Sequence, residues 1–193
     1  TGFFDGALDL QIGRLRWHRL AWNFAQLLKC KGYGGFQYSR FCLDRTFDFV
    51  AQELADADLI SHFQLFPPPD TASKRGISVS YYIDLPLTRL FEDYGVGNTI
   101  GSAIAKEAIE KERECYQKAR FVVAMSSWGA RVICEDYKIP PDKVKWILPG
   151  ANLNEDLVES SSPNTDPIIT QFTPSRPFRL GYTGKHYQRK GLP

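Results

Sequence analysis

A group of cations near the carboxyl end of the chain has the composition of an anion-binding loop. A strand-like segment, residues 178–183, is followed by Gly184, Lys185, Arg189 and Lys190 within a few positions. Glycines let a backbone approach a ligand closely, and the N–H groups at a helix start favour an anion. Lysine and arginine add charge-assisted hydrogen bonds to phosphate. The segment therefore predicts a phosphate site, with a solvent-exposed basic turn as the alternative. It matches neither the P-loop nor the G-x-G-x-x-G pattern.

Three polar residues stand where predicted strands end. His62 falls near the end of a strand expected at 58–63, Asp84 follows a strand expected at 77–83, and Ser126 follows one at 121–125. Ligands of parallel sheets bind beyond the carboxyl ends of the strands, so all three residues are candidates for a cleft. Each also has a structural alternative. His62 can be a structural hydrogen-bonding residue, Asp84 can cap the following turn, and Ser126 can cap a helix.

The elements that position these residues alternate between strands and helices. Helices are expected at 14–29, 46–57, 101–119 and 126–137, and a fourth strand at 144–148. In the helix at 101–119, apolar residues recur at helical spacing opposite a charged face. The apolar run at 121–125 is typical of a strand buried on both faces. We therefore predict an α/β fold in which a Rossmann-like parallel sheet is flanked by helices.

The chain divides by composition into three parts. Residues 1–153 form the predicted first domain, which we expect to lack its first strand because no strand pattern precedes the first helix. Residues 154–177 are rich in proline and serine and predict a linker. Residues 178–193 then begin a second domain, or add a strand to the first sheet.

Bulk composition excludes several classes of protein. The 193 residues carry a net charge of +2, which is too little for a typical nucleic-acid binder. No apolar run reaches the length of a transmembrane helix. The four cysteines form no C-x-x-C pair and have no histidine at a ligand spacing, so we expect no zinc site and reduced thiols in a cytoplasmic protein. A peripheral contact with a membrane is left open.

Several segments resemble retaining glycosyltransferases of family 4, which have the two-domain GT-B fold. Residues 119–128, ARFVVAMSSW, are similar to the family segment A-D-x-V-V-A-x-S-x-W/F. Residues 136–144, DYKIPPDKV, resemble D-Y-G-V-P-x-x-K-I, and residues 147–152, ILPGAN, resemble V-x-P-N-G-V-D. The basic loop contains the R-K-G of the family's second domain, although its first cation is Lys185 rather than arginine. Residues 82–87, YIDLPL, resemble H-D-L-x-P-L, with Ile83 in place of the histidine.

The resemblance implies a function. Lys185 and Lys190, with Gly184 and Arg189 beside them, would bind the diphosphate of a nucleotide sugar such as a UDP- or GDP-hexose, without a required metal or other cofactor. Asp84 would be the catalytic polar residue, and His62 and Ser126 would line the acceptor side of the cleft. The acceptor would be a carbohydrate, a lipid or a protein. We expect the chain alone to be inactive, because the family's Glu-x7-Glu segment would lie beyond Pro193.

Two other functions remain open. A non-catalytic GT-B-like binding module would keep the fold without turnover, and the missing cleft histidine favours it. A different GT-B enzyme, such as a sugar phosphorylase, would need a site for inorganic phosphate or a cofactor, and no lysine in the sequence marks one.

Overall fold

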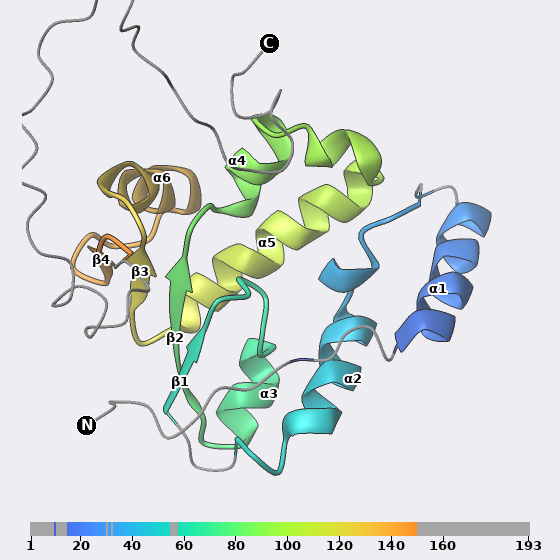
Figure 1. Ribbon diagram of the computed structural model, residues 1–193, viewed down its shortest axis with the longest axis horizontal. Coiled ribbons are helices and arrows are strands. Elements are labelled where there is room, and N and C mark those ends of the chain that lie inside the picture. The colour runs from blue at the N-terminus through green and yellow to red at the C-terminus, as the bar shows by residue number, and fades with distance from the viewer. Residues whose placement is uncertain (1–9, 11–14, 30, 32, 55–57, 150–193) are drawn as a thin grey trace, which may run out of the picture. The chain divides into compact units, whose positions relative to one another are not determined.

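The described part of the chain contains a four-stranded parallel sheet with helices packed beside it (Figure 1). The computed structural model describes residues 10, 15–29, 31, 33–54 and 58–149. The strands are β1 (Asp58–Ser61), β2 (Ser78–Ile83), β3 (Val122–Ala124) and β4 (Val144–Trp146), and they lie in sequential order. Each neighbouring pair is parallel. The prediction of an α/β fold with a parallel sheet flanked by helices is confirmed.

Helices connect the strands and precede them. They are α1 (Arg16–Leu28), α2 (Arg40–Val50), α3 (Pro69–Lys74), α4 (Leu87–Glu92), α5 (Ser102–Lys118) and α6 (Ser127–Tyr137), with short 3-10 helices η2 (Phe36–Tyr38) and η3 (Val96–Thr99). When parallel strands follow one another in order, right-handed connections bring their helices to one face of the sheet. Residues of α5 and α6 indeed share one hydrophobic cluster with strand residues Tyr81, Ile83 and Val122.

The two faces of the sheet differ in burial. Alternate residues, among them Tyr81, Ile83 and Val122, are almost completely buried beneath α5 and α6. On the opposite face, Ile60 is 46% exposed, while Tyr82 is half-buried. In β3, Val122 and Ala124 are buried but Val123, which points to the opposite face, is only partly buried, so the prediction that the third strand is buried on both faces holds for one face alone. The apolar run that suggested it continues into Phe121 and Met125, which lie outside β3.

Several helix bounds differ from the expectation. The predicted second helix is α2, and it starts at Arg40 rather than at residue 46. The reason is a cap: the hydroxyl of Ser39 accepts a hydrogen bond from the Cys42 amide at the start of this helix. The helix ends at Val50. The helices α3 and α4 were not predicted. Each is only six residues long and begins just after a proline, at Pro69 after Pro68 and at Leu87 after Pro86, so neither has a readable helical period.

Some predictions concern residues outside those that the structure describes. The predicted linker at 154–177, the strand at 178–183 and the basic loop with Gly184, Lys185, Arg189 and Lys190 all lie outside the described residues. Within the described part of the chain, no helix combines the length and the apolar character needed to cross a bilayer.

Candidate functional site

The three polar residues predicted for a cleft lie at one edge of the sheet. His62 immediately follows β1, Asp84 follows β2, and Ser126 comes two residues after β3. Ser61 pairs with Tyr81, and Ile83 pairs with Ala124, so the three strands end at nearly the same level. Because the strands are parallel, these ends form a single carboxyl edge, where α/β proteins bind ligands.

His62 lies against an aromatic ring of the neighbouring strand. Its imidazole and the Tyr82 ring are 5.2 Å apart between centroids and meet edge to face. The Tyr82 hydroxyl in turn donates a long hydrogen bond, 3.5 Å, to the backbone carbonyl of Ile147 beyond β4. His62 is exposed, and its side chain makes no hydrogen bond to any residue that the structure describes. It therefore presents ring nitrogens to solvent at the carboxyl edge, held by an aromatic contact.

Ser126 has the structural role that was its alternative. Its hydroxyl accepts a hydrogen bond from the Gly129 amide at 3.0 Å and caps α6. Among the described residues, no histidine or carboxylate accepts a hydrogen bond from this hydroxyl, so nothing in that part of the chain activates it as a nucleophile. The confirmed role is thus capping.

Asp84 lies beside the start of α6. A Cβ atom added at Gly129 would come within 3.2 Å of the Ser126 hydroxyl and 3.7 Å of the Asp84 carbonyl oxygen, so the first turn of α6 packs closely against the end of β2. Asp84 is exposed. The N-cap residue of α4 is Pro86, which makes no side-chain capping hydrogen bond. Asp84 therefore does not cap α4, which was its structural alternative. Its carboxylate remains available to a ligand at the carboxyl edge.

Ile83, at the position of the family's histidine, is part of the core. It is 1% exposed and packs with Tyr81 and residues of α5 and α6. A side chain that faces the core in this way cannot contact a ligand. Among the described residues, an exposed imidazole at this edge is provided by His62, which follows the adjacent strand β1 rather than β2.

A buried carboxyl group supports the Asp84 segment from below, and sequence reasoning missed it. Glu112, in the middle of α5, is completely buried and accepts hydrogen bonds from the Leu87 amide at 3.0 and 3.2 Å. It also accepts from the hydroxyls of Tyr116, at 2.6 Å, and Tyr137. Glu112 therefore binds the first amide of α4, three residues after Asp84.

Further bonds tie the same segment to the end of α6. The Thr88 amide donates to the Tyr137 hydroxyl at 3.1 Å, and the Thr88 hydroxyl donates to the Asp136 carboxylate, also at 3.1 Å. Arg89 forms an ion pair with the same carboxylate at 3.1 Å. The first turn of α4 is thus fixed by polar contacts from both α5 and α6, and within the loop that carries Asp84 the Leu85 carbonyl accepts a hydrogen bond from the Gln64 side chain at 2.8 Å.

Burial controls the charge of this network. It raises the pKa of Glu112 to about 7, although the hydrogen bonds from Tyr116, Tyr137 and Leu87 act in the opposite direction. Burial likewise raises the pKa of Tyr116 and of Tyr137, and the nearby Glu112 adds to both shifts. Near neutral pH the tyrosines stay protonated as donors while Glu112 titrates.

The position of Glu112 is visible in the sequence. It stands four residues after Ala108 and four before Tyr116, so it falls in the middle of the apolar stripe of α5. An acidic residue on an otherwise apolar helix face is the signal that would have identified it.

Comparison of the chain with protein families, with curated proteins and with solved structures finds no match in any of the three. Among the residues that the structure describes, no three histidine, cysteine, aspartate or glutamate side chains gather as metal ligands would.

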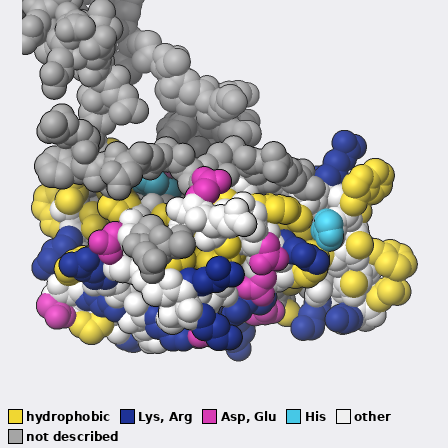
Figure 2. Space-filling model, turned by 90° about the horizontal axis from the view of Figure 1, so that it is seen from below, with side chains coloured by type: hydrophobic (Ala, Val, Ile, Leu, Met, Phe, Trp, Pro, Cys, Tyr) yellow, Lys and Arg dark blue, Asp and Glu magenta, His cyan; other side chains and the backbone are white. Residues whose placement is uncertain are grey.

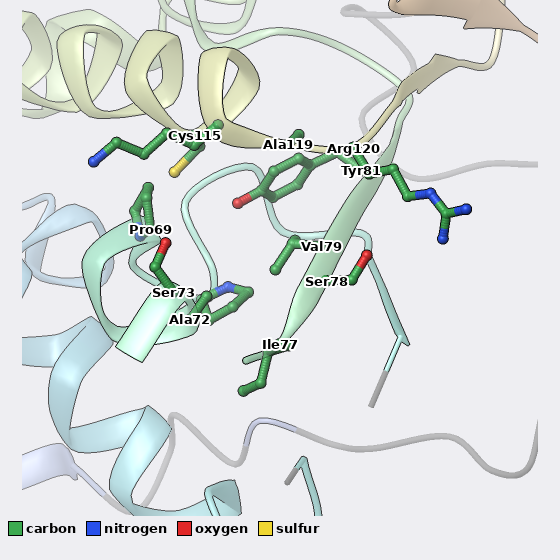
Figure 3. A pocket seen from close by; sticks show the side chains of 12 residues that line it. Pro69, Ala72, Ser73, Ile77, Ser78, Val79, Tyr81, Cys115, Ala119 and Arg120 are labelled. Carbon is green, nitrogen blue, oxygen red and sulfur yellow. The ribbon is translucent and has the colours of Figure 1, made fainter. Parts of the chain in front are cut away.

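The cavity shown in Figure 3 lies away from this edge. It has a volume of about 150 Å³ between α3, the start of β2 and the end of α5, at the amino edge of the sheet. The Cys115 thiol and the Tyr81 hydroxyl lie beside each other on its wall, and burial raises the pKa of Cys115 to about 12 and that of Tyr81 as well. A thiol that stays protonated is a poor nucleophile, so the cavity offers space for small molecules but no activated group.

Proposed function

We propose that this chain belongs to a retaining glycosyltransferase of the GT-B class, which transfers a sugar from a nucleotide-diphosphate sugar to an acceptor. The proposal rests on the resemblance of residues 119–128, 136–144 and 147–152 to family 4 segments. One structural observation supports it. Asp84 is an exposed carboxylate at the carboxyl edge of a parallel sheet, on the loop before α4, and a buried hydrogen bond holds the first amide of that helix. Such an edge is where α/β proteins bind their ligands.

Each residue has an assigned role in this proposal. Lys185, Arg189 and Lys190, with the Gly184 backbone, hold the diphosphate and stabilise its charge as it leaves. Asp84 provides the catalytic polar group at the reacting sugar. His62, on the neighbouring strand, faces the acceptor side and takes the place that Ile83 cannot fill. Ser126 shapes the same edge through the cap of α6.

The fixed start of α4 next to the Asp84 loop would favour catalysis by Asp84. Catalytic groups lose rate steeply when they are misplaced by about 1 Å, so a loop bearing one benefits from rigid support. The Leu87 amide is held by Glu112 at 3.0 Å, and Thr88 is held by Asp136 at 3.1 Å. These contacts fix the first turn of α4, which begins three residues after Asp84.

A binding module without turnover is the second candidate, and the burial of Ile83 favours it. That side chain is 1% exposed and packs in the core, so the segment resembling H-D-L-x-P-L offers a ligand no polar group at this position. The two candidates differ in turnover, whereas both allow sugar nucleotides to bind.

The decisive experiment is a transfer assay with the full-length protein and labelled UDP- and GDP-hexoses. We expect sugar release or transfer with retained anomeric configuration. Asp84→Asn should lower kcat/KM by at least about 100-fold, the lower end of what a positioned catalytic acid or base contributes. Asp93→Asn, at the exposed end of α4, is the matched control and should leave the rate unchanged. Binding of a sugar nucleotide with no turnover by the wild-type protein would establish the binding module instead.

A further inference from the structure

The helix α1 packs with its more polar side toward the protein. Trp22 meets the Phe36 ring edge to face at 5.8 Å between centroids, and the His18 ring lies 5.7 Å from that of Phe41. The Asn23 side chain accepts a hydrogen bond from the Gly34 amide at 3.1 Å. Contacts from His18, Trp22 and Asn23 thus fix the rotation of the helix about its own axis.

This orientation leaves the larger apolar side of the helix uncovered. We define the α1 face as the five large side chains that point outward: Trp17, Leu20, Phe24, Leu27 and Leu28. Trp17 is 76% exposed, Phe24 64% and Leu28 71%. Along the chain these five residues are separated by three, four, three and one positions, which places them all on one side of an α-helix. In Figure 2, hydrophobic side chains gather at the right-hand end of the molecule, where α1 lies. A contiguous apolar surface of this kind marks a site of interaction.

Charge is segregated into the same part of the chain. Residues 10–43 contain six lysine and arginine residues and no aspartate or glutamate, so this segment carries +6 while the whole chain carries +2. The remaining residues therefore have a net charge of −4. Among the described residues of this segment, Arg40 is the one that forms ion pairs with carboxylates. No described carboxylate forms an ion pair with Arg16, Arg19, Lys29 or Lys31.

We propose that the α1 face docks the protein on an anionic lipid bilayer. An amphipathic helix with Trp, Phe and Leu on one side and cations beside them lies in the plane of a membrane interface, with its apolar side among the acyl chains. The neighbouring cations then face the lipid phosphates, whose surface potential attracts them. This inference concerns a surface apart from the carboxyl edge, and it does not depend on the proposed transferase activity.

Charge argues against the other occupants. Two copies joined through the α1 face would bring two segments of +6 together, which is repulsive. Nucleic acid would match the charge but would leave the five large apolar side chains in water. An anionic membrane is the occupant that satisfies both the apolar and the cationic parts.

Vesicle flotation of the full chain tests the proposal. We expect binding to vesicles of phosphatidylcholine mixed with phosphatidylglycerol, and much weaker binding to phosphatidylcholine alone or at high salt. Phe24→Gln should weaken the binding about tenfold or more, the effect of withdrawing one large apolar side chain from the acyl region. The double variant R16Q/R19Q should weaken it by about fivefold for each charge removed.

Phe49→Gln is the matched control, because Phe49 is also exposed, at 46%, but belongs to α2. It should bind as the wild type does. All variants alter exposed side chains, and circular dichroism verifies that each is folded. Failure of the wild type to bind anionic vesicles overturns the proposal, as does equal binding by Phe24→Gln. If light scattering instead shows a dimer that Phe24→Gln dissociates, the α1 face is a self-association surface and the lipid assignment is wrong.

Discussion

At the scale of single residues, the buried carboxyl group of Glu112 organises the neighbourhood of the candidate site. It is completely buried and accepts hydrogen bonds from one amide and two tyrosine hydroxyls. A buried carboxyl group of this kind is costly when ionised unless its partners compensate. Its protonation therefore links the stability of the fold to pH.

Glu112 should make the protein more stable as the pH falls through the neutral range. Its pKa is about 7 in the folded state and about 4.5 when unfolded, so the folded state binds more protons between these values. The resulting stabilisation, at most about 3 kcal/mol, is fully present below pH 4.5 and is lost as the pH rises through 7. Urea unfolding of the wild type and of Glu112→Gln measures it. The unfolding free energy of the wild type minus that of Glu112→Gln should rise as the pH falls. A value of this difference that does not change with pH would contradict the raised pKa.

Ser126 provides a prediction about helix capping. Because its hydroxyl accepts from the Gly129 amide, Ser126→Ala should lower the free energy of unfolding by about 1 kcal/mol. Ser127→Ala removes the next hydroxyl, which is exposed and lies inside the helix, and should have little effect. If urea unfolding shows the same loss of unfolding free energy for both variants, the capping hydrogen bond of Ser126 does not stabilise the fold.

The residue-level roles were only partly predictable. The capping role of Ser126 could be expected from its place between a strand and a helix pattern. Glu112 was missed because an apolar stripe was identified by its apolar members, while the partners of Glu112, Leu87 and Tyr137, are 25 residues away on either side. Such long-range pairing is not encoded in local periodicity.

At the scale of elements, long periodic segments were the most predictable. The helix α5 and the strand β2 begin and end within a residue or two of their predicted bounds, because α5 shows a clear helical period and β2 is rich in β-branched and aromatic residues. The start of α2 was misplaced because its cap, Ser39, stands seven residues before the expected start at 46. The helices α3 and α4 are too short for a period and were not predicted.

The junction before η2 provides an element-scale prediction. Gly35 has a φ of +76°, and a Cβ atom there would come within 2.9 Å of the Ile104 side chain on α5. Gly35→Ala should therefore lower the free energy of unfolding by about 2 kcal/mol, from backbone strain and steric overlap together. At Gly95 the φ is also positive, +64°, but the nearest atom would be 3.5 Å away. Gly95→Ala should cost only about 1 kcal/mol. Thermal unfolding compares the two, and a loss at Gly35 no greater than that at Gly95 would exclude the steric contribution.

At the scale of the whole molecule, the order of the elements predicted the parallel sheet and the edge at which polar residues gather. Strands alternating with helices leave few topologies, and in a parallel sheet all carboxyl ends share an edge. The orientation of α1 could not be predicted in the same way. An amphipathic helix is expected to bury its apolar side, whereas Trp17, Phe24 and Leu28 face outward here.

The most direct test of the proposed phosphate site, on which the transferase function depends, is calorimetric binding of UDP- and GDP-hexoses to the full-length protein. We predict binding, and a rise of at least about tenfold in Kd for Lys190→Ala, because that variant loses a charge-assisted bond to the diphosphate. Lys145→Ala, an exposed lysine on β4, is the control for charge and should bind as the wild type does. No binding by the wild type, or an unchanged Kd for Lys190→Ala, would contradict the proposed phosphate site and with it the transferase function.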